Sequence, residues 1–308
     1  MDAVPGYSNN MNDNKPLLSI IIPVFNRQKG VNALIDTLSK SISQNGVAHA
    51  VEIIVIDDAS DTPLTLPETP CKCLLKRNSR NLGAPFSRTR GLLLANGKFI
   101  HFHDSDDSVS ENWLKELLDE LQQHPDIDLL VTGRIDYEKQ HALERFPTFY
   151  HRQVQYPKRI LKRLIYWNCI GAMGGVTFSK RVLETIKIRR IASCQDWQMY
   201  IDVLKRARKL SSRPDIKFFF HKTGNDRISH NPRKKILGHL QLAKQTQYDS
   251  IYGKNIRLFY LYACKQYILK QGGYILKFYK KHQLKIFLAY IVIAAHSFMP
   301  QIMLRDKK

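Results

Sequence analysis

The sequence predicts an α/β fold in which the strands of an open sheet alternate with helices, followed by a basic helical C-terminal extension. The apolar runs at residues 17–25 and 51–56 are typical of strands that are buried on both faces of a sheet. A third strand, expected at 98–103, ends abruptly in acidic residues. Segments with helical spacing separate these strands, as a doubly wound sheet requires.

The remaining elements continue this alternation. After the first strand we expect a helix at 30–43, and after the second a weak strand at 71–75 and a loop at 77–83. A helix at 84–95 stops at an Asn-Gly pair and leads into the third strand. Further along, the apolar spacing predicts a helix at 111–123, a strand at 129–134, a helix at 156–168, a helix that follows Asp196 and ends at 208, and a strand at 216–220.

Three carboxylates, Asp104, Asp106 and Asp107, follow the third strand within four positions. Ligands of open α/β sheets bind at the carboxyl ends of the strands, and a divalent cation with oxygen ligands would offset the clustered charge. The sequence therefore predicts a metal and nucleotide-diphosphate site here. A surface loop without metal is the alternative reading of such a triplet. His101 and His103 share one face of the strand, and we favour packing or a place at the substrate edge over metal ligation.

Charge divides the 308-residue chain into two unlike halves. Residues 1–155 contain 16 Lys and Arg against 20 Asp and Glu, whereas residues 156–308 contain 32 against 7. The cationic half favours polyanions, namely nucleic acid, anionic lipid headgroups or diphosphate-bearing substrates. The five cysteines include no CxxC pair, which disfavours a disulfide framework or a zinc site and fits a reducing cytosol. We expect the polar residues 1–15 to form a disordered leader.

The C-terminal region, 236–308, is predicted to be basic, aromatic and helical. Its apolar stretch, 286–299, is short for a membrane span and follows several lysines. A basic flank beside an apolar helix favours a segment that lies in the headgroup layer of an anionic membrane. A true span through 286–304 and an ordinary packed helix are the alternatives.

Five motifs occur in a characteristic order, at residues 19–27, 55–61, 80–84, 95–100 and 104–107. Together they resemble the family 2 inverting glycosyltransferases of the GT-A fold, a Rossmann-like nucleotide-sugar-binding mixed sheet flanked by helices. Each motif is weak alone, but the series is specific. The resemblance implies a GT-A domain at 16–235, with a nucleotide-sugar-binding half at 16–110 and an acceptor half at 111–235.

The resemblance also implies roles for individual residues in binding a UDP-sugar donor. Asp106 stands where the family has a direct ligand of Mn²⁺ or Mg²⁺, and Asp104 would contact the ribose or support the metal. Asp58 would hydrogen-bond the uracil. The remaining donor contacts implied by the resemblance are Pro23, Val24 and Phe25 along the uracil ring, with Asn81 and Gly83 at the base and ribose.

Asp196 matches the family's catalytic base, although Gln195 replaces the glutamate that usually precedes it. Such a base would deprotonate an acceptor hydroxyl as it attacks the anomeric carbon, and an α-linked donor would give a β-linkage. Asp196 could instead only cap the helix that follows. The glycine-rich segment 171–175 stands where the family contacts its acceptor, or forms a tight turn. Arg227, His230 and Arg233 lie in a basic loop that could close over a diphosphate.

The QxxRW signature of processive members is absent from the sequence, so we expect one sugar to be transferred per encounter. We expect a hexosyltransferase that moves glucose or galactose to N-acetylglucosamine on undecaprenyl diphosphate, in surface-polysaccharide (O-antigen or capsule) synthesis. The enzyme would work peripherally at the cytoplasmic face of the bacterial inner membrane, on its anionic surface, without a nucleic-acid partner. The alternatives are an aspartyl-nucleophile phosphohydrolase with Asp104 as nucleophile, and a non-enzymatic protein that binds polyanions or membranes. A calcium loop is disfavoured because Val109 replaces the required glycine.

Overall fold

The structure, a computed structural model, describes residues 15–138, 141–145, 157–164 and 168–221, with residues 234, 237, 238, 241 and 242 in addition. Residues 1–14 of the predicted leader, the basic loop with Arg227, His230 and Arg233, and the C-terminal apolar stretch lie outside the described residues. Among the helices that are described, none has the length and apolar character needed to cross a membrane.

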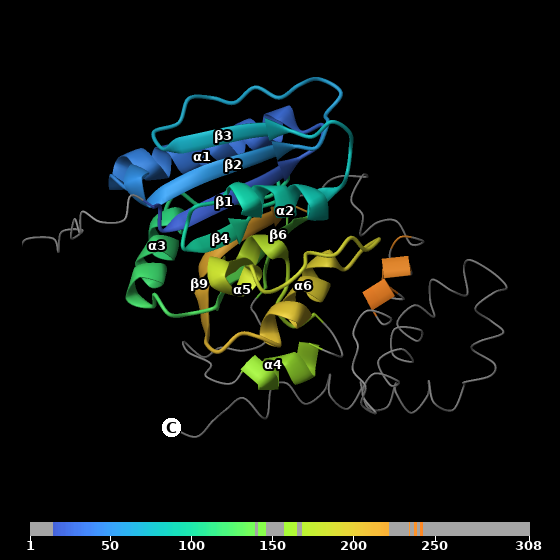
Figure 1. Cartoon of the computed structure of the whole chain (residues 1–308). Coiled ribbons are helices and arrows are strands. Elements are labelled where there is room, and N and C mark those ends of the chain that lie inside the picture. Colours follow the sequence, from blue (N-terminus) through green and yellow to red (C-terminus); the bar gives the residue numbers. More distant parts are fainter. Residues whose placement is uncertain are drawn as a thin grey trace, which may run out of the picture.

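The core of the protein is a mixed sheet, which confirms the predicted fold class. In the described part of the chain its order is β3-β2-β1-β4-β8-β6-β9-β5, with β7 paired to β6. Figure 1 shows β3, β2, β1 and β4 side by side, and these four are parallel. The strands are β1 (Leu18–Val24), β2 (Val51–Asp57), β3 (Lys72–Arg77), β4 (Phe99–Phe102), β5 (Ser108–Val109), β6 (Leu129–Glu138), β7 (His141–Arg145), β8 (Val176–Ser179) and β9 (Leu210–His221).

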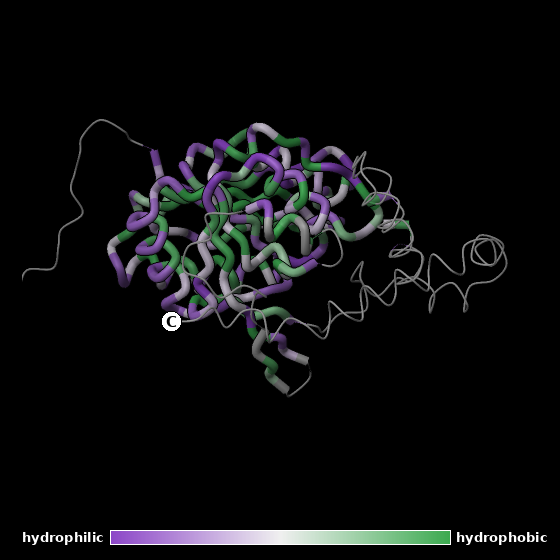
Figure 2. The backbone as a smooth tube through the Cα atoms, turned by 90° about the horizontal axis from the view of Figure 1, so that it is seen from below, coloured by the Kyte–Doolittle hydropathy of each residue, from purple (hydrophilic) through white to green (hydrophobic). Residues whose placement is uncertain are grey.

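Helices cover both faces of the sheet. They are α1 (Gln28–Asn45), α2 (Ala84–Leu94), α3 (Trp113–Gln123), α4 (Pro157–Leu164), α5 (Lys180–Leu183) and α6 (Gln195–Leu204). One apolar cluster joins α1 and α3 to the sheet and includes Ile20 and Ile22, whereas the other joins α4, α5 and α6 and includes Ile21. Alternate residues of β1 thus enter opposite cores, which explains its continuous apolar run. Figure 2 shows hydrophobic segments running through the interior.

Several elements differ from the prediction in length or were not predicted. Strand β9 begins six residues before the expected strand and contains Pro214, a residue that normally argues against a strand interior. A register shift between Thr132 and Gly133 accommodates this proline, and a side chain on Gly133 would collide with the Pro214 carbonyl. Helix α6 ends at Leu204 instead of 208. The short elements β5, β7, β8 and α5 were not predicted.

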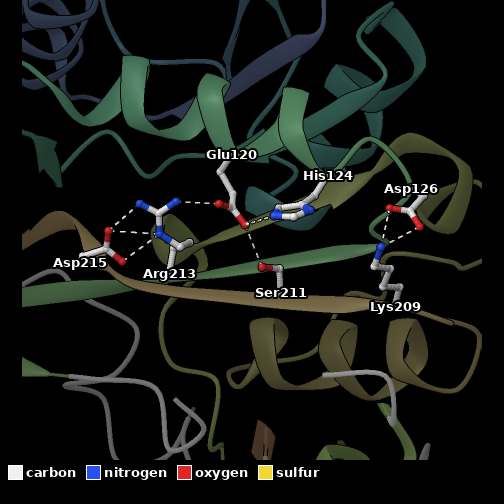
Figure 3. Close-up of polar contacts among 7 residues, drawn as sticks. All are labelled: Glu120, His124, Asp126, Lys209, Ser211, Arg213 and Asp215. Atoms are coloured by element: carbon white, nitrogen blue, oxygen red, sulfur yellow. Dashed lines mark hydrogen bonds and ion pairs between the residues drawn. The ribbon is translucent and has the colours of Figure 1, made fainter. Parts of the chain in front are cut away.

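Polar contacts fix α3 against β9, as Figure 3 shows. The Glu120 carboxylate is buried and accepts hydrogen bonds from Ser211 Oγ at 2.9 Å and Arg213 Nη1 at 2.6 Å. Arg213 also donates to Asp215 Oδ2 at 2.6 Å. Two residues of β9 thus share the Glu120 carboxylate of α3, so the network fixes the orientation of β9 against this helix.

Candidate active site

A cavity of about 640 Å³ lies where β1, β2 and β4 end, which is the edge of a parallel sheet where ligands bind. One side is lined by Pro23, Val24 and Phe25 after β1, by Asp58 after β2 and by Asp104 and Asp106 after β4. The other side is lined by Arg134, Phe220, Gly171 and residues 193–196. The size suits a small-molecule ligand.

The acidic cluster offers oxygen ligands from three residues. Carboxylate oxygens of Asp104, Asp106 and Asp107 all lie within 4.8 Å of one another. Asp106 pairs with Arg27 at 3.1 Å, and buried Asp107 accepts a hydrogen bond from the backbone N–H of His221 at 3.2 Å. Asp104 and Asp106 line the cavity, and such a close group of carboxylate oxygens fits a hard divalent cation such as Mg²⁺ or Mn²⁺. The predicted pair Asp104 and Asp106 thus lies together, with Asp107 as a third donor.

Arg88, a residue that the sequence reasoning missed, connects the acidic cluster to Asp196. Its buried guanidinium donates from Nη2 to Asp104 Oδ1 at 2.7 Å, and Nη1 lies 3.9 Å from Asp196 Oδ1. The signal for this inward position is helical spacing, since Ser87 and Gly91 on α2 are also buried. Arg88 therefore forms ion pairs with two acids that line the same cavity.

Asp196 lies in the first turn of α6 and faces the cavity, with its side chain 32% exposed. Burial raises the pKa of its carboxyl to about 6; the positive charge of Arg88 opposes this shift, and the negative charge of Asp104 adds to it. The helix cap position belongs to Cys194, so the interpretation of Asp196 as only a helix cap is wrong. Gln195 lines the same cavity and donates to the Ile191 carbonyl at 3.0 Å.

Asp58, which follows β2, organises the loop that follows β3. Its carboxylate accepts hydrogen bonds from the backbone N–H groups of Leu82 at 3.0 Å and Gly83 at 2.7 Å, and from Asn78 Nδ2 at 2.7 Å. Asp58 also lines the cavity, together with Ala84, whereas Asn81 and Gly83 are not among its lining residues. A contact between Asp58 and a base stays a prediction, but its support of the loop was not anticipated.

The glycine-rich segment has two different structural roles. A Cβ on Gly174 or on Gly175 would lie 2.9 Å from the Phe218 ring, so packing explains both glycines. Gly171, in contrast, has a positive φ of 113° and lines the cavity with Ala172. Only the first part of the segment is therefore placed to contact a ligand in the described structure.

The two histidines before the acidic cluster are buried in the core. His101 contacts Thr177 Oγ1 at 2.9 Å and His103 Nδ1 at 3.3 Å, and both rings lie against Trp113. Burial lowers the pKa of His103 to about 4, so its ring is neutral at physiological pH. The structure agrees with the packing interpretation of these residues.

The sheet and its cavity define a GT-A domain, a fold that binds nucleotide sugars. The chain belongs to glycosyl transferase family 2, whose model matches residues 19–186. This membership favours the transferase prediction over the phosphohydrolase alternative.

Comparisons with curated proteins agree with the family. The chain is 25% identical over 192 residues to an uncharacterized glycosyltransferase of Haemophilus influenzae, which covers 61% of the chain and 62% of the relative. It is 25% identical over 267 residues to the putative colanic acid biosynthesis glycosyl transferase WcaA of Escherichia coli, covering 81% of the chain and 88% of the relative. The match covers 40% of the glycosyltransferase GlyG of Streptococcus pneumoniae, so the chain spans less than two thirds of the length of this relative and of the Haemophilus influenzae protein.

Solved structures show the same fold. The Staphylococcus aureus TarS fragment 1–349 in complex with UDP-GlcNAc has a TM-score of 0.62 at 18% identity, and the match covers 88% of the chain and 79% of the fragment. The mannosyltransferase PcManGT of Pyrobaculum calidifontis, in complex with GDP-Man and Mn²⁺, has a TM-score of 0.53 at 13% identity, covering 92% and 86%.

Proposed function

We propose that the protein is an inverting, metal-dependent, non-processive glycosyltransferase that moves one sugar from a UDP-sugar to an acceptor linked to a lipid diphosphate. The observation that carries this proposal is the arrangement of one cavity. Carboxylates suited to a metal lie at the end of β4, and a carboxyl with a raised pKa lies opposite, with Arg88 between Asp104 and Asp196.

Asp196 is the group that takes the proton. With a pKa of about 6 it is ionised at neutral pH and still basic enough to accept a proton from a hydroxyl that becomes acidic during attack. Burial makes the carboxylate a better base, while Arg88 keeps it from becoming protonated near pH 7. A hydroxyl deprotonated by Asp196 attacks the anomeric carbon, and the carbon–oxygen bond to the diphosphate breaks.

Asp104 and Asp106 would hold the cation, with Asp107 beside them. When bound, the cation neutralises charge on the departing diphosphate. The ion pairs of Arg27 with Asp106 and of Arg88 with Asp104 keep both carboxylates at the cavity wall.

A UDP-sugar donor is supported by the fold likeness to TarS, whose structure contains UDP-GlcNAc. We propose glucose or galactose as the transferred sugar and a β-linkage in the product. Pro23, Val24 and Phe25 line the cavity together with Asp58, and Phe25 is 41% exposed. An exposed ring beside a carboxylate suits stacking and hydrogen bonding to uracil.

The acceptor is proposed to be N-acetylglucosamine on undecaprenyl diphosphate, in O-antigen or capsule synthesis at the cytoplasmic face of the inner membrane. The similarity to WcaA, named for colanic acid biosynthesis, supports a role in surface polysaccharide. The charge of residues 156–308, with 32 Lys and Arg against 7 Asp and Glu, supports peripheral binding to an anionic membrane.

The proposal is tested by measuring UDP release with a panel of UDP-sugars and a synthetic GlcNAc-diphospho-lipid, with Mn²⁺, with Mg²⁺ and with EDTA. We expect acceptor-dependent release with one donor, lost with EDTA and in Asp106→Ala. Surface variant Arg190→Gln removes an exposed charge and serves as the control, with unchanged activity. Release of inorganic phosphate without UDP, or full activity in EDTA, would contradict the proposal.

A further inference from the structure

We propose that Arg134 forms an anion subsite that binds the phosphate next to the acceptor sugar and so selects phosphorylated acceptors. This inference rests on the proposed function and adds a specificity residue to it. Arg134 is on β6 and lines the cavity on the side of Gly171 and Phe220, across from the donor residues after β1 and β2.

The guanidinium of Arg134 is held in place from two directions. Asp136 Oδ1 lies 2.7 Å from Nε, and Asp136 Oδ2 accepts a hydrogen bond from Nη2 at 3.4 Å. The guanidinium carbon lies 4.9 Å from the centre of the Phe220 ring, a cation–π contact. Buried Asp136 thus pairs with Nε and Nη2 and leaves Nη1 to other contacts.

The free end of Arg134 faces Gly171. A Cβ on Gly171 would meet Nη1 at 3.9 Å, so the absent side chain leaves space beside this nitrogen. Asn168 fixes the turn at Gly171 through two hydrogen bonds. Its Oδ1 accepts from the Gly171 N–H at 3.0 Å, and its Nδ2 donates to the Gly171 carbonyl at 2.8 Å. Within the described residues no atom accepts a hydrogen bond from Nη1, although the side chain is only 25% exposed.

The other arginines of the cavity are engaged by the donor-side acids. Arg27 pairs with Asp106, and Arg88 lies between Asp104 and Asp196. Arg134 pairs with Asp136, which does not line the cavity, so its open end adds positive charge on the acceptor side. Guanidinium groups match phosphate oxygens through two parallel N–H donors, which gives direction as well as attraction.

Arg134 lies in the same cavity as the proposed base, Asp196. The charges of both residues influence the pKa of the buried Tyr200 hydroxyl, Asp196 more strongly than Arg134. An acceptor sugar bound in this cavity with its hydroxyl at Asp196 would place its anomeric phosphate near Arg134. The subsite would bind a sugar that carries a phosphate or diphosphate ester in preference to an uncharged glycoside.

The test is a binding measurement that needs no turnover. The affinities of full-length protein for a short-chain GlcNAc-diphospho-lipid and for the matched uncharged GlcNAc alkyl glycoside are measured by calorimetry, with saturating UDP and Mn²⁺ to occupy the donor side. The variant Arg134→Lys keeps a positive charge beside Asp136 but loses the paired N–H donors of the guanidinium. We expect it to weaken diphosphate binding about tenfold. Binding of the uncharged glycoside should change less than about twofold, and Arg190→Gln should change neither.

Equal affinity of the wild-type protein for both compounds, or unchanged diphosphate binding in Arg134→Lys, would overturn the inference. Equal weakening of both compounds would also overturn it, because it would indicate a general structural role. UDP release is measured on the same samples: its absence with preserved, Arg134-dependent binding would refute the proposed reaction while leaving the subsite intact.

Discussion

Replacing Arg88 with methionine should shift the pH dependence of the enzyme. Arg88 Nη1 lies 3.9 Å from Asp196 Oδ1, and its positive charge lowers a pKa that burial has raised to about 6. Without this charge the carboxyl holds its proton more tightly, and the nearby charge of Asp104 increases the effect. Because a general base works only when ionised, activity is lost as pH falls through the pKa, and the loss should begin at a higher pH in the variant.

The size of the shift follows from the distance. Two unit charges at 3.9 Å interact by about 4 kcal/mol at an effective dielectric constant of about 20. The Asp196 side chain is 32% exposed, so solvent screens much of this energy, and we expect about 1.4 kcal/mol, or about one pKa unit, to remain. A one-unit rise from about 6 lowers the ionised fraction at pH 6 from about one half to about one tenth, a loss of about fivefold, with little loss at pH 8.

The assay is kcat for UDP release between pH 5.5 and 9 at saturating donor, acceptor and metal. Arg88→Lys is the matched variant, since it keeps a positive charge in the same place and should keep the acid limb near that of the wild type. A uniform fall in kcat at every pH, with the acid limb unmoved in Arg88→Met, would refute the link between Arg88 and the ionisation of Asp196.

Three further predictions concern the metal and the scaffold. Removal of divalent metal by EDTA should lower turnover at least about 100-fold, and excess Mn²⁺ should restore it; turnover that survives dialysis against EDTA would exclude a metal role for Asp106. Arg213→Met leaves the buried Glu120 carboxylate of Figure 3 without its cation and should lower the free energy of unfolding by about 3 kcal/mol, measured by urea denaturation, with Lys209→Met as a milder exposed control. Gly174→Ala places a Cβ 2.9 Å from the Phe218 ring and should cost about 1–3 kcal/mol of stability without changing acceptor affinity; a selective loss of acceptor affinity would show that the packing explanation is wrong.

The parallel half of the fold could be predicted because its residues obey local rules. Leu18–Val24 and Val51–Asp57 are buried along their whole length, so their unbroken apolar runs identified them. Strand β9 was predicted too short because Pro214 argues against a strand, and the compensating bulge opposite Gly133 involves a residue distant in sequence. Short strands such as β8 gain their stability from pairing with β4 and β6, which a local pattern does not record.

The site was predictable where charge was conspicuous in the sequence. Asp104, Asp106 and Asp196 lie in one cavity as expected, since each stands in a recognisable motif. Arg88 was missed because its helical spacing with Ser87 and Gly91 indicates a buried face but not a charged partner, and Arg134 was missed because nothing local indicates that it faces the cavity. Their roles depend on partners across the fold, Asp196 for Arg88 and Phe220 for Arg134. Tertiary geometry alone separates them from solvated arginines.

The central claim, that Asp196 is the base of a transfer reaction in this cavity, is tested most directly by Asp196→Asn. The asparagine keeps the size of the side chain and removes its basicity, so the measurement compares acceptor-dependent UDP release with UDP affinity in the same preparation. The account predicts that release falls about 10²–10⁴-fold while UDP affinity stays within about threefold of the wild type. Release that persists above about one tenth of the wild-type rate would contradict it.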